Sequence, residues 1–159
     1  NKYRVLYLDF SDFNAENFEC ALAYIADKMS NTYKYFHDLF DPENDKYFYV
    51  SKFEKVIDII EKKSTAKVLQ NSLQDLVVQL RGHESHCSKK KLAILIDNMV
   101  ELERVAERYG YTSEMNSFLE GFIVKDVYKF CDLFIHIIDC ETDYEDSFFS
   151  RRYKSDAYF

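Results

Sequence analysis

The stretch Leu92-Ala93-Ile94-Leu95-Ile96-Asp97 decides the fold of this chain. A continuous apolar run that ends in an acid is typical of a strand buried on both faces of a parallel sheet. The triple lysine at 89–91 leads into the run. We therefore predict a buried strand over residues 92–97 and expect the other elements to pack around it.

Two further stretches predict strands of the same kind. Residues 4–10 read RVLYLDF, and residues 132–138 contain the apolar run LFIHII. Both are rich in residues that favour β structure. We expect these six side chains to be almost fully buried in one sheet: Leu6, Leu8, Ile94, Ile96, Ile135 and Ile137.

Between the strands, apolar residues recur with the 3.6-residue period of amphipathic helices. The first such pattern runs from Phe18 to Met29. Two later patterns begin with the spacing of a capping box. In such a box a Ser side chain caps the first turn of the helix, and an acid three residues later bonds to the backbone N–H of that Ser. The boxes are Ser51 with Glu54, beyond the loop around Pro42, and Ser72 with Asp75.

Two more helices are expected after the central strand. One covers Val100 to Ala106, and Gly110 can end it in the left-handed conformation. Thr112 or Ser113 then caps a longer helix that carries Met115 to Ile123.

Strands that alternate with helices of this length need crossover connections, and hence a mostly parallel sheet covered on both faces. The 159 residues are enough for one hydrophobic core. We therefore predict an α/β protein, a three-layer α/β/α arrangement that forms a single domain over residues 1–159.

Composition excludes some classes of function. No apolar run approaches the roughly 18 residues that a membrane span needs, so we expect a soluble protein. A formal net charge of −7 argues against nucleic acid as a direct partner.

The cysteines occur singly, and Cys20 and Cys131 lie in apolar patterns where a free thiol acts as a small hydrophobe, which favours a reducing, cytoplasmic location. No signal peptide is visible, but a chain that starts at Asn1 and runs directly into a strand leaves room for a removed upstream segment.

The central strand has the form of a Walker B strand, whose terminal carboxylate holds Mg²⁺ directly or through water. Asp97 is accordingly the candidate metal ligand. An acid at the end of a strand also commonly caps the next helix, and the lone motif favours that second interpretation.

Six stretches follow one another in a specific order and spacing. They are VLYLDF at 5–10, SLQDL at 72–76, ILID at 94–97, GYTSEM at 110–115, KD at 125–126 and SFFS at 147–150. This order resembles the AAA-ATPase-like family, predicted P-loop NTPase domains that are often fused to a PD-(D/E)xK nuclease-like domain. The resemblance covers nearly the whole chain and implies a partial P-loop NTPase-like core. It further implies that the three strands lie side by side as the second, third and fourth of a 5-1-4-3-2 sheet.

Departures from that family point away from catalysis. The family has Asp-Glu at the strand end, whereas this chain has Asp97-Asn98, and an amide cannot take a proton from water. Ile138-Asp139 and Thr142 stand where the family has a Thr-Gly and an Arg, and residues 151–154 replace its Gly-Leu-Asn-Asn.

The phosphate-binding loop GxxxxGK[ST] is missing from the sequence. The chain has three glycines, and none of them lies in such a motif. In the family this loop lies upstream of the first strand seen here. The chain is therefore either a segment of a longer protein or a descendant that lost that half, and Asn98 favours the second.

Other clusters carry weaker predictions. His83, His86 and Cys87 fit a solvated loop better than a zinc site. The alternating acids at 139–146 favour a hydrated turn over a Ca²⁺ or Mg²⁺ site. The aromatic residues at 33–40, with His37 among them, favour core packing over a ligand cage. No Ser/His or Cys/His pair at a specific spacing suggests a nucleophilic hydrolase.

We therefore expect a catalytically degenerate P-loop-NTPase-like domain that acts as a protein-binding or regulatory module, with no cofactor and no catalytic residue of its own. The alternative is the C-terminal part of an ATPase domain whose P-loop lies on another segment. A metal-dependent activity built on Asp97 and the acids at 139–146 has the least support.

The partner is expected at the edge strand Leu133 to Ile138, which would lack the neighbour that covers it in the family. An exposed apolar edge is an aggregation hazard. Another chain, a missing segment of this chain, or residues 156–159 folding back would cover it.

Overall fold

The computed structural model describes residues 2–39, 57–60, 65–83, 90–123, 127 and 131–137. Among these residues, no helix is both long enough and apolar enough to cross a membrane. Residues 57–60 are helical. The other elements, in chain order, are β1 (Tyr3–Asp9), α1 (Phe18–Phe36), the 3₁₀ helix η1 (His37–Leu39), α3 (Ala66–His83), β2 (Lys91–Asp97), α4 (Val100–Tyr109), α5 (Thr112–Phe122) and β3 (Leu133–Ile137).

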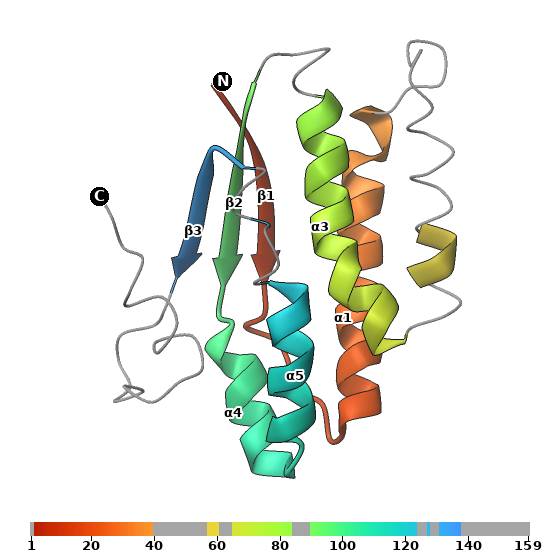
Figure 1. The fold of residues 1–159 in the computed structure, drawn as a ribbon. Coiled ribbons are helices and arrows are strands. Elements are labelled where there is room, and N and C mark those ends of the chain that lie inside the picture. Colours follow the sequence, from red (N-terminus) through yellow and green to blue (C-terminus); the bar gives the residue numbers. More distant parts are fainter. Residues whose placement is uncertain are drawn as a thin grey trace.

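The three strands form one parallel sheet with β2 in the centre (Figure 1). Tyr3 to Asp9 of β1 lie opposite Lys91 to Asp97 of β2, and Ala93 to Asp97 lie opposite all of β3. The prediction of an α/β fold with a parallel sheet is thus confirmed, and the three strands lie within one or two residues of their expected bounds.

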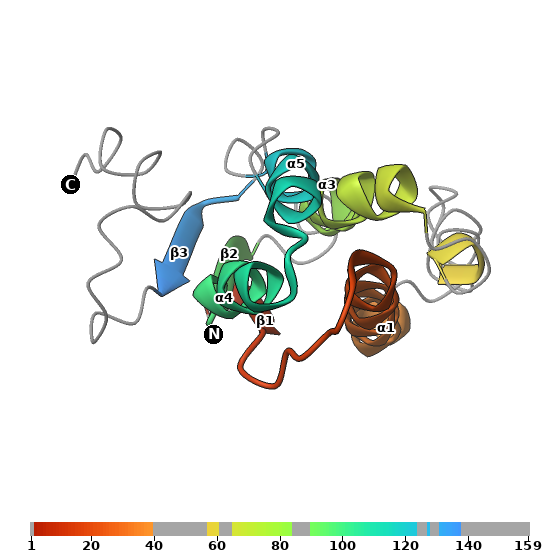
Figure 2. The same cartoon turned by 90° about the horizontal axis from the view of Figure 1, so that it is seen from below.

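One face of the sheet forms the hydrophobic core. Leu6, Leu8, Ile94 and Ile96 are buried, as expected, because alternate residues of a strand point to the same face. They join one cluster with apolar residues of α1, α3 and α5, and Figure 2 shows these helices on one side of the sheet. Helix α4 lies beyond the carboxyl ends of the strands (Figure 1).

The opposite face of the sheet is the open face, made of Tyr3, Val5, Tyr7, Ala93, Leu95, Leu133 and Ile135. Ile135 is exposed, so its predicted burial is wrong: its parity in β3 points it away from the helices. The side chain of Ile137 lies outside the described residues. A three-layer arrangement stays a prediction, since no second helical layer is among the described elements.

Helix α1 begins as the sequence indicates. Asn17 is its N-cap, and its side-chain oxygen accepts a hydrogen bond from the Cys20 N–H at 2.9 Å. Cys20 itself is exposed, so the prediction that it acts as a small buried hydrophobe is wrong. Its position in the first turn of the helix places it off the apolar stripe. Cys131 is half-buried, and burial raises the pKa of its thiol.

The predicted capping box Ser72 with Asp75 is wrong, because α3 begins at Ala66 and Ser72 lies in its second turn. The Ser72 hydroxyl instead donates to the Leu69 carbonyl at 2.7 Å. The Ser72 carbonyl accepts a bond from the buried Tyr33 hydroxyl at 2.7 Å, which joins α1 to α3. The box Ser51 with Glu54 lies outside the described residues.

Gly110 ends α4 in the left-handed conformation, with φ 80° and ψ 25°, as predicted. Tyr111 rather than Thr112 or Ser113 is the N-cap of α5, and no side chain caps that helix end, so the predicted cap is wrong. The Tyr111 hydroxyl points into the core instead, where it donates to the Ala15 carbonyl at 2.9 Å. Burial raises the pKa of Tyr111 to about 12.

Asp132 joins the start of β3 to its surroundings. Its carboxylate accepts from the Leu92 N–H at 2.8 Å and pairs with Arg81 of α3 at 2.5 Å. Its own N–H donates to the Leu92 carbonyl at 2.8 Å. These bonds align the amino ends of β2 and β3 and attach both to the end of α3.

Truncation of Ile96 to Ala is expected to lower the free energy of unfolding by about 2 to 5 kcal/mol, because it leaves a cavity in the buried face of the central strand. Urea unfolding followed by circular dichroism measures the change. Val78→Ala on the exposed side of α3 is the matched control and should change stability by less than about 0.5 kcal/mol. A loss below about 1 kcal/mol for Ile96→Ala would show that the strand is misplaced.

Candidate functional site

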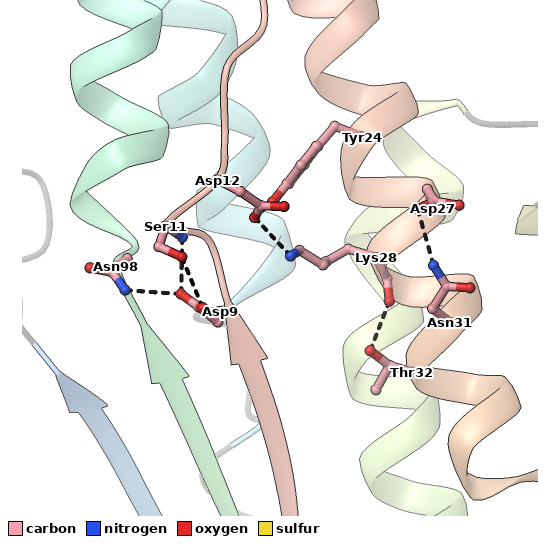
Figure 3. A network of polar contacts seen from close by, with 9 residues as sticks. All are labelled: Asp9, Ser11, Asp12, Tyr24, Asp27, Lys28, Asn31, Thr32 and Asn98. Atoms are coloured by element: carbon pink, nitrogen blue, oxygen red, sulfur yellow. Dashed lines mark hydrogen bonds and ion pairs between the residues drawn. The ribbon is translucent and has the colours of Figure 1, made fainter.

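The carboxyl ends of β1 and β2 bring polar side chains together at one edge of the sheet. Asp9 and Asp97 end the two strands and lie directly opposite each other. Ligands of open α/β sheets bind beyond this edge. Figure 3 shows the cluster, in which Asp9, Ser11 and Asn98 point toward one another.

Asp9 is the centre of this cluster. Its Oδ1 accepts from the Ser11 N–H and from the Asn98 side-chain amide, each at 2.9 Å. Its Oδ2 accepts from the Ser11 hydroxyl at 2.9 Å. Burial alone would raise the pKa of Asp9, but the bonds from Asn98 and Ser11 outweigh it and hold the pKa below its ordinary value. Asp9 is therefore an ionised acceptor at neutral pH.

Asp97 is the predicted metal ligand, and both of its carboxylate oxygens accept hydrogen bonds. Oδ1 accepts from the Asn98 N–H at 2.9 Å, and Oδ2 accepts from the Tyr7 hydroxyl at 3.3 Å. Loss of water around the phenol, followed by the nearby charges of Asp9 and Asp97, raises the pKa of Tyr7. The tyrosine thus stays protonated and continues to donate to Asp97.

Asn98 turns the chain from β2 into α4. It has a positive φ of 56°, a region that residues other than Gly rarely adopt and that Asn tolerates better than most. Its carbonyl accepts from the Glu101 N–H at 3.0 Å in the first turn of the helix. This backbone geometry carries the side-chain amide across to Asp9 on the neighbouring strand.

A second polar group lies beside the first. The Lys28 ammonium is 2.9 Å from Asp12 Oδ1, and the Tyr24 hydroxyl donates to the same oxygen. Burial, followed by the bond to Asp12, raises the pKa of Tyr24 to about 12. Tyr24 and Lys28 are four residues apart on α1, and Asp12 lies in the turn between β1 and that helix. This spacing is a sequence signal that the motif-based predictions did not use.

The described residues do not complete a metal site. No group of three His, Cys, Asp or Glu side chains among them is placed to hold a metal ion. Asp9 and Asp97 supply two carboxylates whose oxygens all accept N–H or O–H donors. This arrangement fits a structural hydrogen-bond network, and a metal-binding role for Asp97 stays a prediction.

The other predicted clusters are only partly within the described residues. His83 ends α3, whereas His86, Cys87 and the acids at 139–146 lie outside them. In the aromatic group, Tyr33 and Phe36 are buried, which confirms core packing for these two. Tyr35 is exposed, so core packing is wrong there: it points away from the apolar stripe of α1.

No known protein family, curated protein or solved structure matches the chain.

Replacement of Asn98 separates the two roles of this residue. Asn98→Gly keeps the positive φ but removes the bond to Asp9, and should cost about 1 kcal/mol of stability. Asn98→Ala also strains the backbone and should cost about 1 kcal/mol more. Thermal unfolding of both variants measures the difference, and equal losses would show that the backbone conformation carries no cost.

The cost of Asn98→Gly should also depend on pH. Because the folded-state pKa of Asp9 is depressed, the stability that its ionised form contributes is present above the ordinary Asp pKa near 4 and is lost as pH falls through the folded value. The gap between wild type and Asn98→Gly should therefore close in acid. A gap that is the same at pH 7 and at about pH 3 would contradict the bond to Asp9.

Proposed function

We propose that this chain is a catalytically degenerate P-loop-NTPase-like domain that acts as a protein-binding or regulatory module. The order of its motifs and the parallel sheet with β2 between β1 and β3 support this proposal. A three-layer α/β/α core, a cytoplasmic location and the lack of a cofactor or nucleic-acid partner belong to the same proposal.

The proposal rests mainly on the identity and the hydrogen bond of the Asn98 side chain. It occupies the position where the resembled family has the Glu that orients attacking water, and an amide does not accept that proton. Its nitrogen donates to Asp9, so the side chain serves to join β1 to β2. A residue with this geometry stabilises the edge of the sheet and does not activate water.

The edge of β3 supports a binding role. Among the described strands, β3 pairs only with β2, and no described strand bonds to the backbone groups on its outer side. Such an edge favours pairing with another strand. We therefore propose a protein partner, or a second copy of the chain, at the Leu133–Ile138 edge.

One observation favours the alternative, an ATPase segment whose P-loop lies elsewhere. Asp9 and Asp97 lie side by side at the carboxyl edge, where P-loop NTPases hold Mg²⁺ and phosphate. In that case the two carboxylates would approach the metal only once the missing loop is supplied.

Calorimetry with Mg-ATP tests the leading proposal. We expect no hydrolysis and no affinity tighter than about millimolar, because no glycine loop cradles the phosphates. Asn98→Glu should leave the chain inactive as well, since restoring one carboxylate does not restore a phosphate site. Micromolar binding would contradict the proposal, and binding that Asp97→Asn abolishes would favour the ATPase alternative.

Hydrogen exchange tests the edge of β3. The backbones of Lys91 and Asp97 bond on the β1 side, so Ile94 and Ile96 of β2 face β3. Ile94 lies opposite Phe134, and a parallel ladder therefore directs the N–H groups of Leu133 and Ile135 toward β2 and those of Phe134 and His136 outward. The inward pair is the internal control and should exchange slowly. With the edge covered by a second copy of the chain or by an added partner, we expect the outward pair to exchange at least about tenfold more slowly than a free peptide. Outward amides at the free-peptide rate would contradict this, and all four at that rate would refute the strand.

A further inference from the structure

We propose that the open face of the sheet binds one amphipathic helix of a partner protein, which lies antiparallel to the strands. The inference rests on the proposed binding function and names the surface and the chemistry of its partner, whose helix would take the place of a second helical layer of this chain. Because the open face uses side chains and the β3 edge uses backbone groups, the two contacts are separable.

The open face carries an apolar patch of a size that often marks a binding surface. Parallel sheets are normally covered on both faces, and here the described helices cover one. On the core face, Leu6, Leu8 and the apolar residues of β2 are buried, and Phe134 of β3 is partly buried. Five large apolar side chains remain exposed on the open face: Tyr3 at 38%, Val5 at 47%, Tyr7 at 50%, Leu133 at 42% and Ile135 at 38%.

The size of the open face suits one helix. Two strand spacings separate β1 from β3, roughly 10 Å, which is about the diameter of a helix with its side chains. The seven residues of β1 span roughly 23 Å, the length of a helix of about 15 residues.

The area of the open face disfavours a second copy of the chain as the occupant. A large apolar or aromatic side chain has on the order of 200 Å² of surface, so five side chains about two-fifths exposed present roughly 400 Å². A stable protein interface buries about 800 Å² per partner. The open face supplies about half of that, which disfavours a dimer of sheets joined by this face alone, whereas its width and length match one helix.

The surface shape of the open face favours a helix with large apolar residues. Ala93 lies between Val5 and Leu133 in register and is only 3% exposed, because its longer neighbours on both sides shield it. At Ala93 the face is therefore lower than at its two sides, whereas the next central residue, Leu95, is large and partly exposed. Leu or Ile side chains that recur every three to four residues along a helix would fit over Ala93.

Charges at the two ends of β2 set the direction of the helix. Lys91 lies at the amino end of the face, with its ammonium 6.0 Å from the centre of the Tyr3 ring. Asp97 lies at the carboxyl end, beside the Tyr7 hydroxyl. The N-terminus of a helix is partly positive and the C-terminus partly negative. An antiparallel helix thus places its N-terminus near Asp97 and its C-terminus near Lys91.

A designed 15-residue peptide with one Leu stripe is the probe, and a peptide of the same composition with a scrambled order is its control. Nuclear magnetic resonance on the whole chain should show shifts at the Val5, Leu133 and Ile135 methyls with the striped peptide alone. A nitroxide at the peptide N-terminus should broaden signals near Asp97, and one at the C-terminus should broaden signals near Lys91.

Two variants give the matched comparison. Val5→Lys places a charge in the open face and should weaken peptide binding at least tenfold. Val78→Lys makes the same change on an exposed valine of α3, 43% exposed in the free chain, and should leave binding unchanged. Both substitutions lie on exposed positions, so the fold should persist, and the amide spectrum checks that it does.

Several results would overturn the inference. These are shifts outside the open face, equal binding of the scrambled peptide, a reversed broadening pattern, or equal effects of the two valine variants. A dimer in sedimentation that Val5→Lys dissociates would assign the face to a second copy. Protection of Tyr3 and Tyr7 from hydroxyl radicals in the free monomer, with Tyr35 reactive, would mean that the chain covers its own face.

Failure of this inference and failure of the proposed function give different results. A chain that does not hydrolyse ATP and does not bind the striped peptide keeps the non-catalytic proposal and loses this inference. A chain that hydrolyses ATP and binds the peptide at the open face keeps this inference and loses the non-catalytic proposal.

Discussion

Parallel pairing of β2 with a strand on each side is the constraint on which the rest of the structure depends. A strand in the middle of a parallel sheet directs alternate side chains to opposite faces and ends at the same edge as its neighbours. In β2, this sends Ile94 and Ile96 into the helices, Ala93 and Leu95 to the open face, and Asp97 to the carboxyl edge. One strand thus contributes to the core, the open face and the polar cluster.

The polar cluster and the open face differ in what they offer to a ligand. At the carboxyl edge, the acids accept hydrogen bonds from Asn98, Ser11 and Tyr7, so the groups that could bind a ligand bind one another. On the open face, the large apolar side chains contact less of the chain and remain in water. The hydrophobic effect favours covering such a surface.

Sequence patterns predicted the elements better than their surroundings. The strands were found because short apolar runs between polar residues are typical of buried strands, and Gly110 because the left-handed end of a helix favours glycine. The exposure of Ile135 was missed because its strand reads as buried on both faces, whereas burial depends on which helices pack there. The Ser72 box failed because a Ser three residues before an acid also occurs inside a helix, where its hydroxyl bonds back to a carbonyl. The bond from Asn98 to Asp9 depends on strand register, which no local pattern encodes.

The register of β1 with β2 has a consequence for how the chain folds. Tyr7 and Asp97 lie 90 residues apart in the sequence, and Asn98 and Asp9 lie 89 apart, so the central pairing joins segments that are synthesised far from each other. Closing so long a loop costs conformational entropy before any strand contact repays it, and topologies of this kind fold slowly. Helices α1 and α3 can form from local contacts, but the sheet must wait until β2 is available. Until then β1 is an unpaired apolar strand, and this is the interval in which the chain is most exposed to aggregation.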